Sequence, residues 1–296
     1  MRVLILGGAG MLGHKLWQTC ASAFDSFVTL RDEFASVARF GIFDKTRTLT
    51  GVRADDFASV QRGLSTVRPD VVVNCIGIVK QDAAAKDPIA SITINSLFPH
   101  RLAQTCGDLN ARLIHLSTDC VFSGSKGNYA EGDSADPPDL YGRTKLLGEI
   151  MADNCLTIRT SMIGRELRGS HGLLEWFLSQ EGKRVRGFKR AIFSGFTTNA
   201  LAGTIVEIIE RHQNLQGIWH VAASPITKFD LLTLIKQTYE LEIEIEADEN
   251  FSCDRSLEGR RFAETTGFQA PAWPAMIAEM HADPTPYNSF RRTDFA

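Results

Sequence analysis

The sequence predicts an α/β protein with a Rossmann-type, doubly wound parallel sheet and a smaller C-terminal substrate-binding lobe. First, an aliphatic run at residues 2–6 ends at a glycine cluster, and helical spacing of apolar residues resumes at residues 11–17. Second, short apolar runs alternate with helical stretches up to about residue 164. Third, the 296 residues are 44% hydrophobic and 23% charged, which is typical of a globular enzyme with a sizeable core.

The first half of the chain supplies most of the expected sheet. Strands are expected at residues 27–30, near 51–52, and at 71–78, 112–117 and 156–160. These runs are mostly apolar, as strands covered on both faces by helices require. Helices are expected at residues 97–109 and 141–152. The loop at 123–140 is rich in Gly, Ser, Asp and Pro, and long loops after parallel strands commonly carry sites.

Beyond residue 164 the alternation becomes irregular. Helices are expected at 173–179, 200–211 and 229–239, strands at 218–222 and 242–246, and a loop at 183–199. We assign residues 1–164 to a nucleotide-binding domain to which 191–222 return, and residues 165–190 and 223–296 to the substrate lobe and tail. The tail at 283–296 is expected to be poorly packed.

Charge and residue usage argue against several classes of protein. A net charge of −3, from 32 Lys+Arg against 35 Asp+Glu, lacks the basic footprint of a nucleic-acid binder. No apolar run approaches the roughly 18 residues of a membrane span. The amino terminus lacks the features of a secretory signal, so the cytoplasm is the expected compartment. Cysteines and histidines show no metal-ligand spacing, so no metal is expected.

The glycines after the first run indicate a bound dinucleotide. They fit both the G-x-G-x-x-G and the G-x-x-G-x-x-G spacing, which let backbone amides at a helix start approach a pyrophosphate. The alternative is a tight turn without a ligand. The expected cofactor-binding residues of this segment are Gly7, Gly10, Met11, Leu12 and Gly13.

Arg31 stands near the end of the second strand, where an NAD-specific site usually has a carboxylate. A guanidinium there pairs with a 2′-phosphate, whereas a carboxylate would repel it. The sequence therefore favours NADP(H), with NAD(H) as the alternative. The adjacent Asp32 weakens this argument, and a solvated charged turn is the competing interpretation.

Tyr141 and Lys145 are one helical turn apart, so the phenol and the ammonium share a face. A nearby ammonium is expected to lower the pKa of the phenol and suit it to proton exchange with a carbonyl. A Y-x-x-x-K pair alone is often a solvated helix face. Here Thr118, at the end of a buried strand, offers a second hydroxyl to the same oxygen.

Three segments carry a resemblance to a known family: GGAGMLG at residues 7–13, STDCVF at 117–122 and YGRTKLLGE at 141–149. They resemble the extended short-chain dehydrogenase/reductases, and among these the dTDP-4-dehydrorhamnose reductases, over residues 1 to about 222. The resemblance implies hydride transfer from NADPH to the C4 keto carbon of a nucleotide-linked 6-deoxysugar. It places the protein in dTDP-rhamnose and cell-surface polysaccharide biosynthesis.

The resemblance also implies residue roles. Thr118 would hold the reacting oxygen, Tyr141 would be the general acid, and Lys145 would bind the nicotinamide ribose and tune Tyr141. The cofactor would lie over Cys75, Ile76 and Gly77, while Asn95 would support Lys145 through water or be a simple polar helix residue.

On the substrate side, the expected residues are Asp119, Cys120, Met162 and Arg255. Asp119 is either a structural cap or a substrate contact. The basic segments at 183–190 and 254–256 could hold a diphosphate. The alternative is that they are solvated surface.

Several departures leave other functions open. The reductases tend to have tyrosine at the position of Cys120 and tryptophan at that of Met162. A cysteine there is also found in the GDP-fucose synthase group, where it serves epimerisation, and His171 could be its partner. Some relatives bind NADP only as regulatory subunits, as in methionine adenosyltransferase. Lys15 replaces a glutamate that binds a metal at a dimer contact in some reductases, so neither that metal nor that particular dimer contact is carried over. The expected oligomeric state is a monomer or a homodimer.

Overall fold

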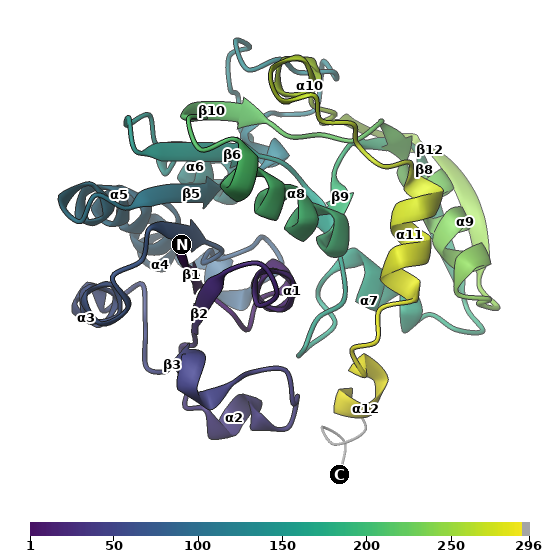
Figure 1. The fold of residues 1–296 in the computed structure, drawn as a ribbon. Coiled ribbons are helices and arrows are strands. Elements are labelled where there is room, and N and C mark those ends of the chain that lie inside the picture. Colours follow the sequence, from purple (N-terminus) through teal and green to yellow (C-terminus); the bar gives the residue numbers. More distant parts are fainter. Residues whose placement is uncertain (292–296) are drawn as a thin grey trace.

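The computed structural model describes residues 1–291, and the predicted fold class is confirmed. Seven parallel strands form the main sheet in the order β10-β6-β5-β4-β1-β2-β3 (Figure 1). The strands are β1 (Arg2–Leu6), β2 (Asp25–Thr29), β3 (Thr48–Leu49), β4 (Val71–Asn74), β5 (Arg112–Leu116), β6 (Cys155–Arg159) and β10 (Gly217–His220). The third strand was expected near residues 51–52, but it lies slightly earlier, at Thr48–Leu49.

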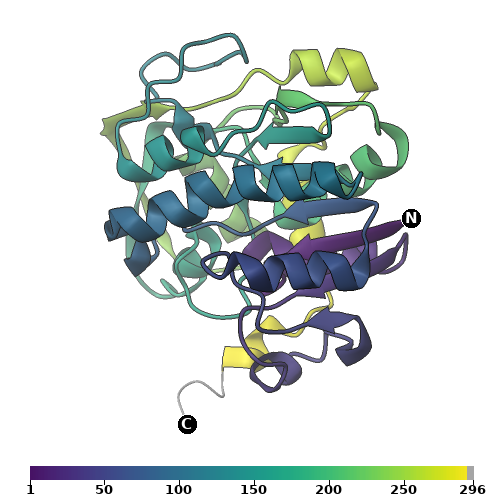
Figure 2. The same cartoon turned by 90° about the vertical axis from the view of Figure 1, so that its left-hand side faces the viewer.

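Helices cover both faces of this sheet. They are α1 (Met11–Cys20), α2 (Ala35–Ala38), α3 (Phe57–Val67), α4 (Pro88–Ser91), α5 (Phe98–Asp108), α6 (Leu140–Leu147) and α8 (Thr198–Arg211). Short turns are the 3₁₀ helices η1 (Lys45–Arg47), η2 (Ala83–Lys86) and η4 (Asp119–Val121) and the π-helical η3 (Ile92–Leu97). Figure 2 shows α3 and α5 lying across the sheet.

Side chains alternate between two cores along each central strand. In β1, Val3 and Ile5 pack into the core that includes α1 and α8, whereas Leu4 and Leu6 pack into the core that includes α3 and α5. All four side chains are almost fully buried. Burial on both faces is why these strands are continuous apolar runs.

The strand order reverses direction between β1 and β4. The connection after β1 leads to β2 and β3 on one side, and later strands add on the other side of β4. In such sheets a crevice opens at the carboxyl ends of the strands at this point. The loops after β1, β4 and β5 therefore meet at one place.

A second, three-stranded sheet has the order β11-β8-β12 and lies beside the main one (Figure 1). The remaining elements are β7 (Met162–Ile163), α7 (Leu173–Leu178), β8 (Arg184–Phe193), β9 (Phe196–Thr197), β11 (Ile226–Thr227), α9 (Lys228–Thr238), β12 (Glu244–Asp254), α10 (Arg260–Thr266), α11 (Trp273–His281) and α12 (Tyr287–Arg291). The expectation of a loop at 183–199 is wrong, because β8 and β9 occupy most of it. The strand expected at 242–246 is longer and runs to Asp254.

The expectation of a poorly packed tail is also wrong as far as the described residues reach; residues 292–296 lie outside them. Asp283 accepts from Lys15 of α1 at 2.5 Å, and both side chains are buried. The Tyr287 hydroxyl bonds His14 Nε2 at 2.8 Å, and Phe290 packs on Phe40 with ring centroids 4.8 Å apart. The tail segment therefore covers α1, the helix that follows the glycine turn.

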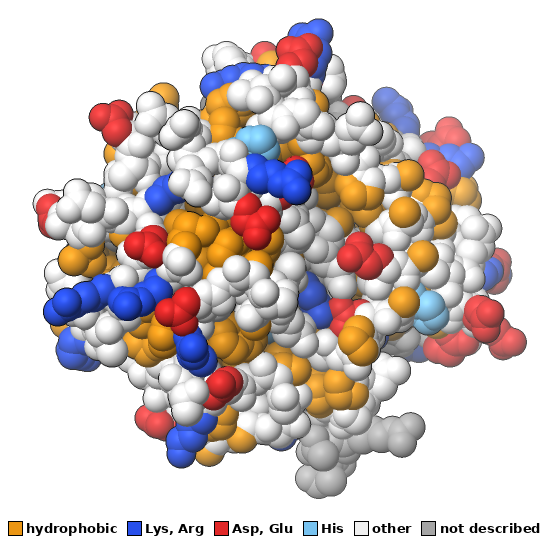
Figure 3. Space-filling model, in the orientation of Figure 1, with side chains coloured by type: hydrophobic (Ala, Val, Ile, Leu, Met, Phe, Trp, Pro, Cys, Tyr) orange, Lys and Arg blue, Asp and Glu red, His pale blue; other side chains and the backbone are white. Residues whose placement is uncertain are grey.

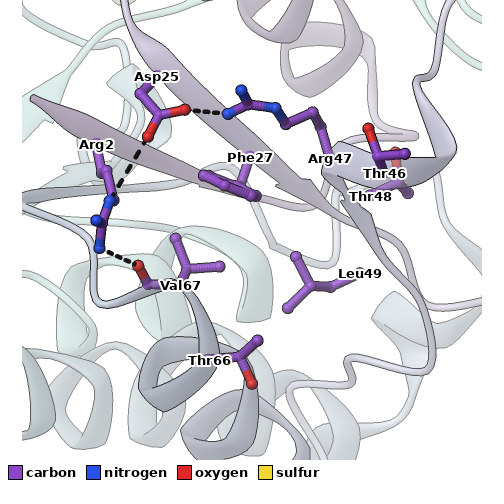
Figure 4. A pocket seen from close by; sticks show the side chains of 9 residues that line it. All are labelled: Arg2, Asp25, Phe27, Thr46, Arg47, Thr48, Leu49, Thr66 and Val67. Atoms are coloured by element: carbon purple, nitrogen blue, oxygen red, sulfur yellow. Dashed lines mark hydrogen bonds and ion pairs between the residues drawn. The ribbon is translucent and has the colours of Figure 1, made fainter.

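A surface groove of about 480 Å³ lies at the opposite edge of the sheet (Figure 4). The strands β1 and β2 begin here, at Arg2 and Asp25. Asp25 forms ion pairs with both Arg2 and Arg47, which also line the groove. Because the loops at the carboxyl ends of the strands carry the candidate residues, this groove is not part of their site.

The buried His14 predicts an acid-sensitive fold. Burial lowers the pKa of His14 from 6.5 to about 4, so the folded protein resists a proton that the unfolded chain accepts. The stability that the neutral His14 contributes to the fold is complete above pH 6.5 and is lost as the pH falls toward 4. Between about pH 7 and 4.5 the free energy of unfolding should fall about 2 kcal/mol more in the unsubstituted protein than in H14Q, measured by urea titration. The exposed H100Q serves as the control, and equal slopes for H14Q and the unsubstituted protein would contradict this prediction.

Candidate active site

The glycine turn after β1 is shaped to bring backbone amides to a ligand. Gly7 has φ +84°, in the region that favours glycine, and Gly10 is the N-cap of α1 without a side-chain cap. A Cβ on Gly13 would lie 2.1 Å from the Gly7 carbonyl oxygen, so the helix packs tightly against the turn. Met11 and Leu12 form the first turn of α1, which contains no acidic residue. This cradle fits a dinucleotide pyrophosphate.

Arg31 follows β2 and is largely exposed, with 73% of its side chain accessible. Its Nε lies 3.5 Å from Asp32, and that carboxylate also accepts from Arg168 at 3.2 Å. Asp32 is thus shared between two cations, which leaves the edge of the Arg31 guanidinium available to a phosphate. Arg168 was not singled out in the sequence, because it reaches Asp32 from a loop 136 residues away.

The segment after β4 lies next to the helix that carries the Tyr/Lys pair. Cys75 and Ile76 are half-buried. A Cβ on Gly77 would lie 3.4 Å from Asn95 Oδ1 and 4.0 Å from Lys145 Nζ. Asn95, in η3, bonds both backbone groups of Ile78 at 2.9 Å. Asn95 therefore fixes this loop against α6.

Thr118 caps the short helix η4 just beyond β5. Its Oγ1 accepts from the Cys120 N–H and donates to Asp119 Oδ1, both at 3.1 Å. Asp119 is therefore part of the cap. Burial raises the pKa of Asp119, while Cys120 and Arg255 oppose the rise.

Lys145 is buried and donates to the Leu116 carbonyl at 2.6 Å. This bond ties α6 to the end of β5 and places Tyr141, one turn earlier, near Thr118 and Cys120. Burial lowers the pKa of Lys145 to about 8, and Glu149 opposes the shift.

The expected lowering of the Tyr141 pKa is wrong for this geometry. Burial raises it above its ordinary value, Cys120 adds to the rise, and hydrogen bonding to Thr118 partly offsets it. The reason is that Lys145 directs its ammonium to the Leu116 carbonyl. At neutral pH Tyr141 is therefore a phenol that carries a proton to donate.

A buried ion pair supports this region from behind. Glu149 accepts from Arg159 at 2.7 and 2.8 Å and from the Ser117 hydroxyl at 2.6 Å. Both charged side chains are at most 6% exposed. Glu149 belongs to the YGRTKLLGE segment, yet its partners are Ser117, just beyond β5, and Arg159 of β6, and they could not be identified from spacing.

Arg255, just beyond β12, reaches the same place from the second sheet. Its Nε donates to the Phe122 carbonyl at 2.9 Å, and its Nη1 lies 3.7 Å from Cys120 Sγ. Burial raises the pKa of the Cys120 thiol to about 12, with Asp119 adding to the rise. Thr118, Asp119, Cys120, Tyr141 and Arg255 thus form one cluster.

Other predicted residues lie farther from this cluster. Met162 is half-buried in β7, which pairs with β9. His171 is exposed, and its backbone N–H donates to Glu166. Among the described residues, no hydrogen bond or ion pair joins His171 to Cys120. In the 183–190 segment, three cations pair with acids of β12; the pairs are Arg184–Glu244, Arg186–Asp248 and Lys189–Glu249.

No helix among the described residues is long and apolar enough to cross a membrane. Within residues 1–291, no group of three His, Cys, Asp or Glu side chains is arranged to hold a metal ion. On the face shown in Figure 3, acidic and basic side chains are interspersed.

The chain is similar to known proteins in both sequence and fold. The sequence profile of the RmlD substrate binding domain matches residues 1–284. A probable dTDP-4,6-dihydroxy-2-methyloxan-3-one 4-ketoreductase from Streptomyces antibioticus is 30% identical over 78% of this chain and 75% of its own. The structure of a hypothetical dTDP-4-dehydrorhamnose reductase from Sulfolobus tokodaii superimposes with a TM-score of 0.76 and 26% identity, covering 92% of this chain and 98% of that one. The NADP complex of the Bacillus anthracis dTDP-4-dehydrorhamnose reductase has a TM-score of 0.77 at 21% identity and covers 95% and 98%.

Proposed function

The chain belongs to the RmlD substrate binding domain family, and we propose that it reduces the C4 keto group of a dTDP-linked 6-deoxysugar with NADPH. The observation that carries this proposal is the placement of Tyr141 beside Thr118 at the end of β5, next to the glycine turn's crevice. The protein works as a monomer or homodimer in the cytoplasm. Its product is an activated deoxysugar for cell-surface polysaccharide.

NADPH supplies the hydride when bound in the glycine cradle. The chain's own residues act on the oxygen of the substrate carbonyl. The Thr118 hydroxyl turns its hydrogen from Asp119 to this oxygen, and the Tyr141 hydroxyl donates a second hydrogen bond to it. Both bonds stabilise the negative charge that develops there. Tyr141 then transfers its proton to that oxygen, and the Thr118 hydrogen bond stabilises the resulting phenolate. Lys145, held at the Leu116 carbonyl, would bind the nicotinamide ribose.

The geometry favours simple reduction over epimerisation. An epimerase of the GDP-fucose synthase type needs an acid and a base on the sugar carbons beside the carbonyl. The high pKa of Cys120 keeps it a thiol, and His171 lies on an exposed loop. The regulatory-subunit alternative makes a different prediction, namely cofactor binding without turnover.

Replacing Tyr141 with phenylalanine removes the proton donor. Y141F should lower turnover of a dTDP-4-dehydro-6-deoxysugar by about 100-fold or more, with NADPH affinity nearly intact. The measurement is NADPH oxidation followed by its absorbance, with the product identified. Y239F is the matched control, because the buried Tyr239 hydroxyl has no hydrogen-bond partner among the described residues. Unchanged turnover in Y141F would refute its role, and absence of oxidation by the unsubstituted protein across a nucleotide-sugar panel would favour the regulator.

Replacing Arg31 tests the cofactor preference. R31Q should weaken NADPH binding by about 10- to 100-fold, because a charge-assisted contact to the 2′-phosphate is lost. Affinity for NADH, which lacks that phosphate, should change far less. Titration of nicotinamide fluorescence measures both, and R62Q on α3 is the control. Equal losses for the two cofactors would show that Arg31 does not read the phosphate.

A further inference from the structure

Arg168 contacts the segment after β2, at the side of the crevice where the adenosine end of the cofactor is expected. Its Nη1 donates to Asp32 Oδ2 at 3.2 Å, and its Nη2 donates to the Ser36 carbonyl at 2.5 Å. Asp32 directly follows Arg31, whose Nε lies 3.5 Å from the other carboxylate oxygen. Two guanidinium groups are therefore held by the same carboxylate, one at each of its oxygens.

The glycine turn fixes where this carboxylate stands. The last residue of β2 is Thr29, whose hydroxyl accepts from the Gly7 N–H at 3.2 Å and whose carbonyl accepts from the Gly8 N–H at 2.9 Å. Asp32 follows three residues later. In a dinucleotide-binding fold, the residues just after the second strand meet the 2′ position of the adenosine ribose. Arg168 is therefore held at the place where NADPH differs from NADH.

The loop that carries Arg168, between β7 and α7, is fixed on both sides of this residue. Leu167 is 2% exposed and belongs to the core that includes α1. The Glu166 carboxylate accepts from the backbone N–H groups of His171 and Gly172, both at 3.0 Å. These contacts close the loop on itself, so Arg168 is presented by a folded segment.

The same loop touches the glycine cradle at its other end. A Cβ on Gly172 would lie 2.7 Å from Met11 Cε, in the first turn of α1. The Arg168 guanidinium lies 5.7 Å from the centroid of the Phe40 ring, a buried ring that packs on Phe290. The loop thus runs from the pyrophosphate cradle to the segment after β2, the two places that the adenosine half of a dinucleotide joins.

The Arg168 side chain keeps hydrogen-bond donors for a ligand. It is 38% exposed, and the Arg31 side chain is 73% exposed, so solvent and ligands reach both. The bonds to Asp32 and Ser36 use one N–H of each terminal nitrogen, and a guanidinium has further N–H groups. Two arginines against one carboxylate also leave a net positive charge.

This arrangement fits a phosphate monoester better than a ribose hydroxyl. A phosphate has several oxygens that accept from two planar guanidinium groups at once. A hydroxyl is bound best by a carboxylate with a free oxygen, whereas both oxygens of Asp32 face an arginine. Resting on the use of NADPH in the proposed function, we propose that Arg168 and Arg31 together bind the 2′-phosphate of NADPH. Arg168 is then a second residue that sets the preference for NADPH over NADH.

The test measures the dissociation constants of NADPH and NADH for the unsubstituted protein, R168Q, R168K and R184Q by titration of nicotinamide fluorescence. R184Q is the matched control, because Arg184 is an exposed arginine that pairs with Glu244 at 3.0 Å on the second sheet. R168Q should weaken NADPH binding by about 10-fold or more and change NADH binding by less than about threefold. R168K keeps the charge without the planar fork and should restore part of the loss.

A second arm uses calorimetry with adenosine 2′,5′-bisphosphate and 5′-AMP, which differ only in the 2′-phosphate. R168Q should reduce the advantage of the bisphosphate by the same factor as for the full cofactors. Neither arm needs turnover, so a protein that binds NADPH without oxidising it would refute the proposed function and leave the test of Arg168 intact. Equal losses for both cofactors would reduce Arg168 to a support of its loop, and unchanged affinities would place it outside the phosphate site. Either result would overturn the inference.

Discussion

The bond from the Lys145 ammonium to the Leu116 carbonyl holds the site together. A buried ammonium must donate its hydrogens, and the end of β5 offers the carbonyl that accepts one at 2.6 Å. This requirement fixes the rotation of α6 over the sheet. Tyr141, one turn earlier, is then carried over Thr118 and Cys120, and Asn95 holds the loop after β4 against the same helix. Displacing this one contact would move the Tyr141 hydroxyl relative to Thr118.

Burial dominates the electrostatics around that contact. It raises the pKa values of Tyr141, Cys120 and Asp119 and lowers that of Lys145. The result is a phenol that keeps its proton and an ammonium that loses one more readily than in water. The Glu149–Arg159 pair lies behind this layer and anchors Ser117, the residue before Thr118, and Glu149 favours the charged form of Lys145.

The central sheet and the Tyr/Lys pair could be predicted because their signals are local. Doubly buried strands need uninterrupted apolar runs, and the glycine turn needs Gly7 at positive φ. The β8 strand was missed because its arginines suggested a solvated loop, whereas they pair with acids of β12 some 60 residues away. Arg168 and the contact between Lys15 and Asp283 were missed for the same reason. Their meaning depends on partners that only the folded chain brings near.

Transfer of an isotopic label shows whether the hydride reaches C4 of the sugar. The protein is incubated with a dTDP-4-keto-6-deoxysugar and NADPH that carries deuterium at both C4 positions of the nicotinamide, and the product is examined by NMR and mass spectrometry. Hydride transfer to the keto carbon should leave one deuterium per product molecule, bonded to C4 of the sugar. Retention of both deuterium atoms on the nicotinamide, or a product without deuterium at C4, would contradict it.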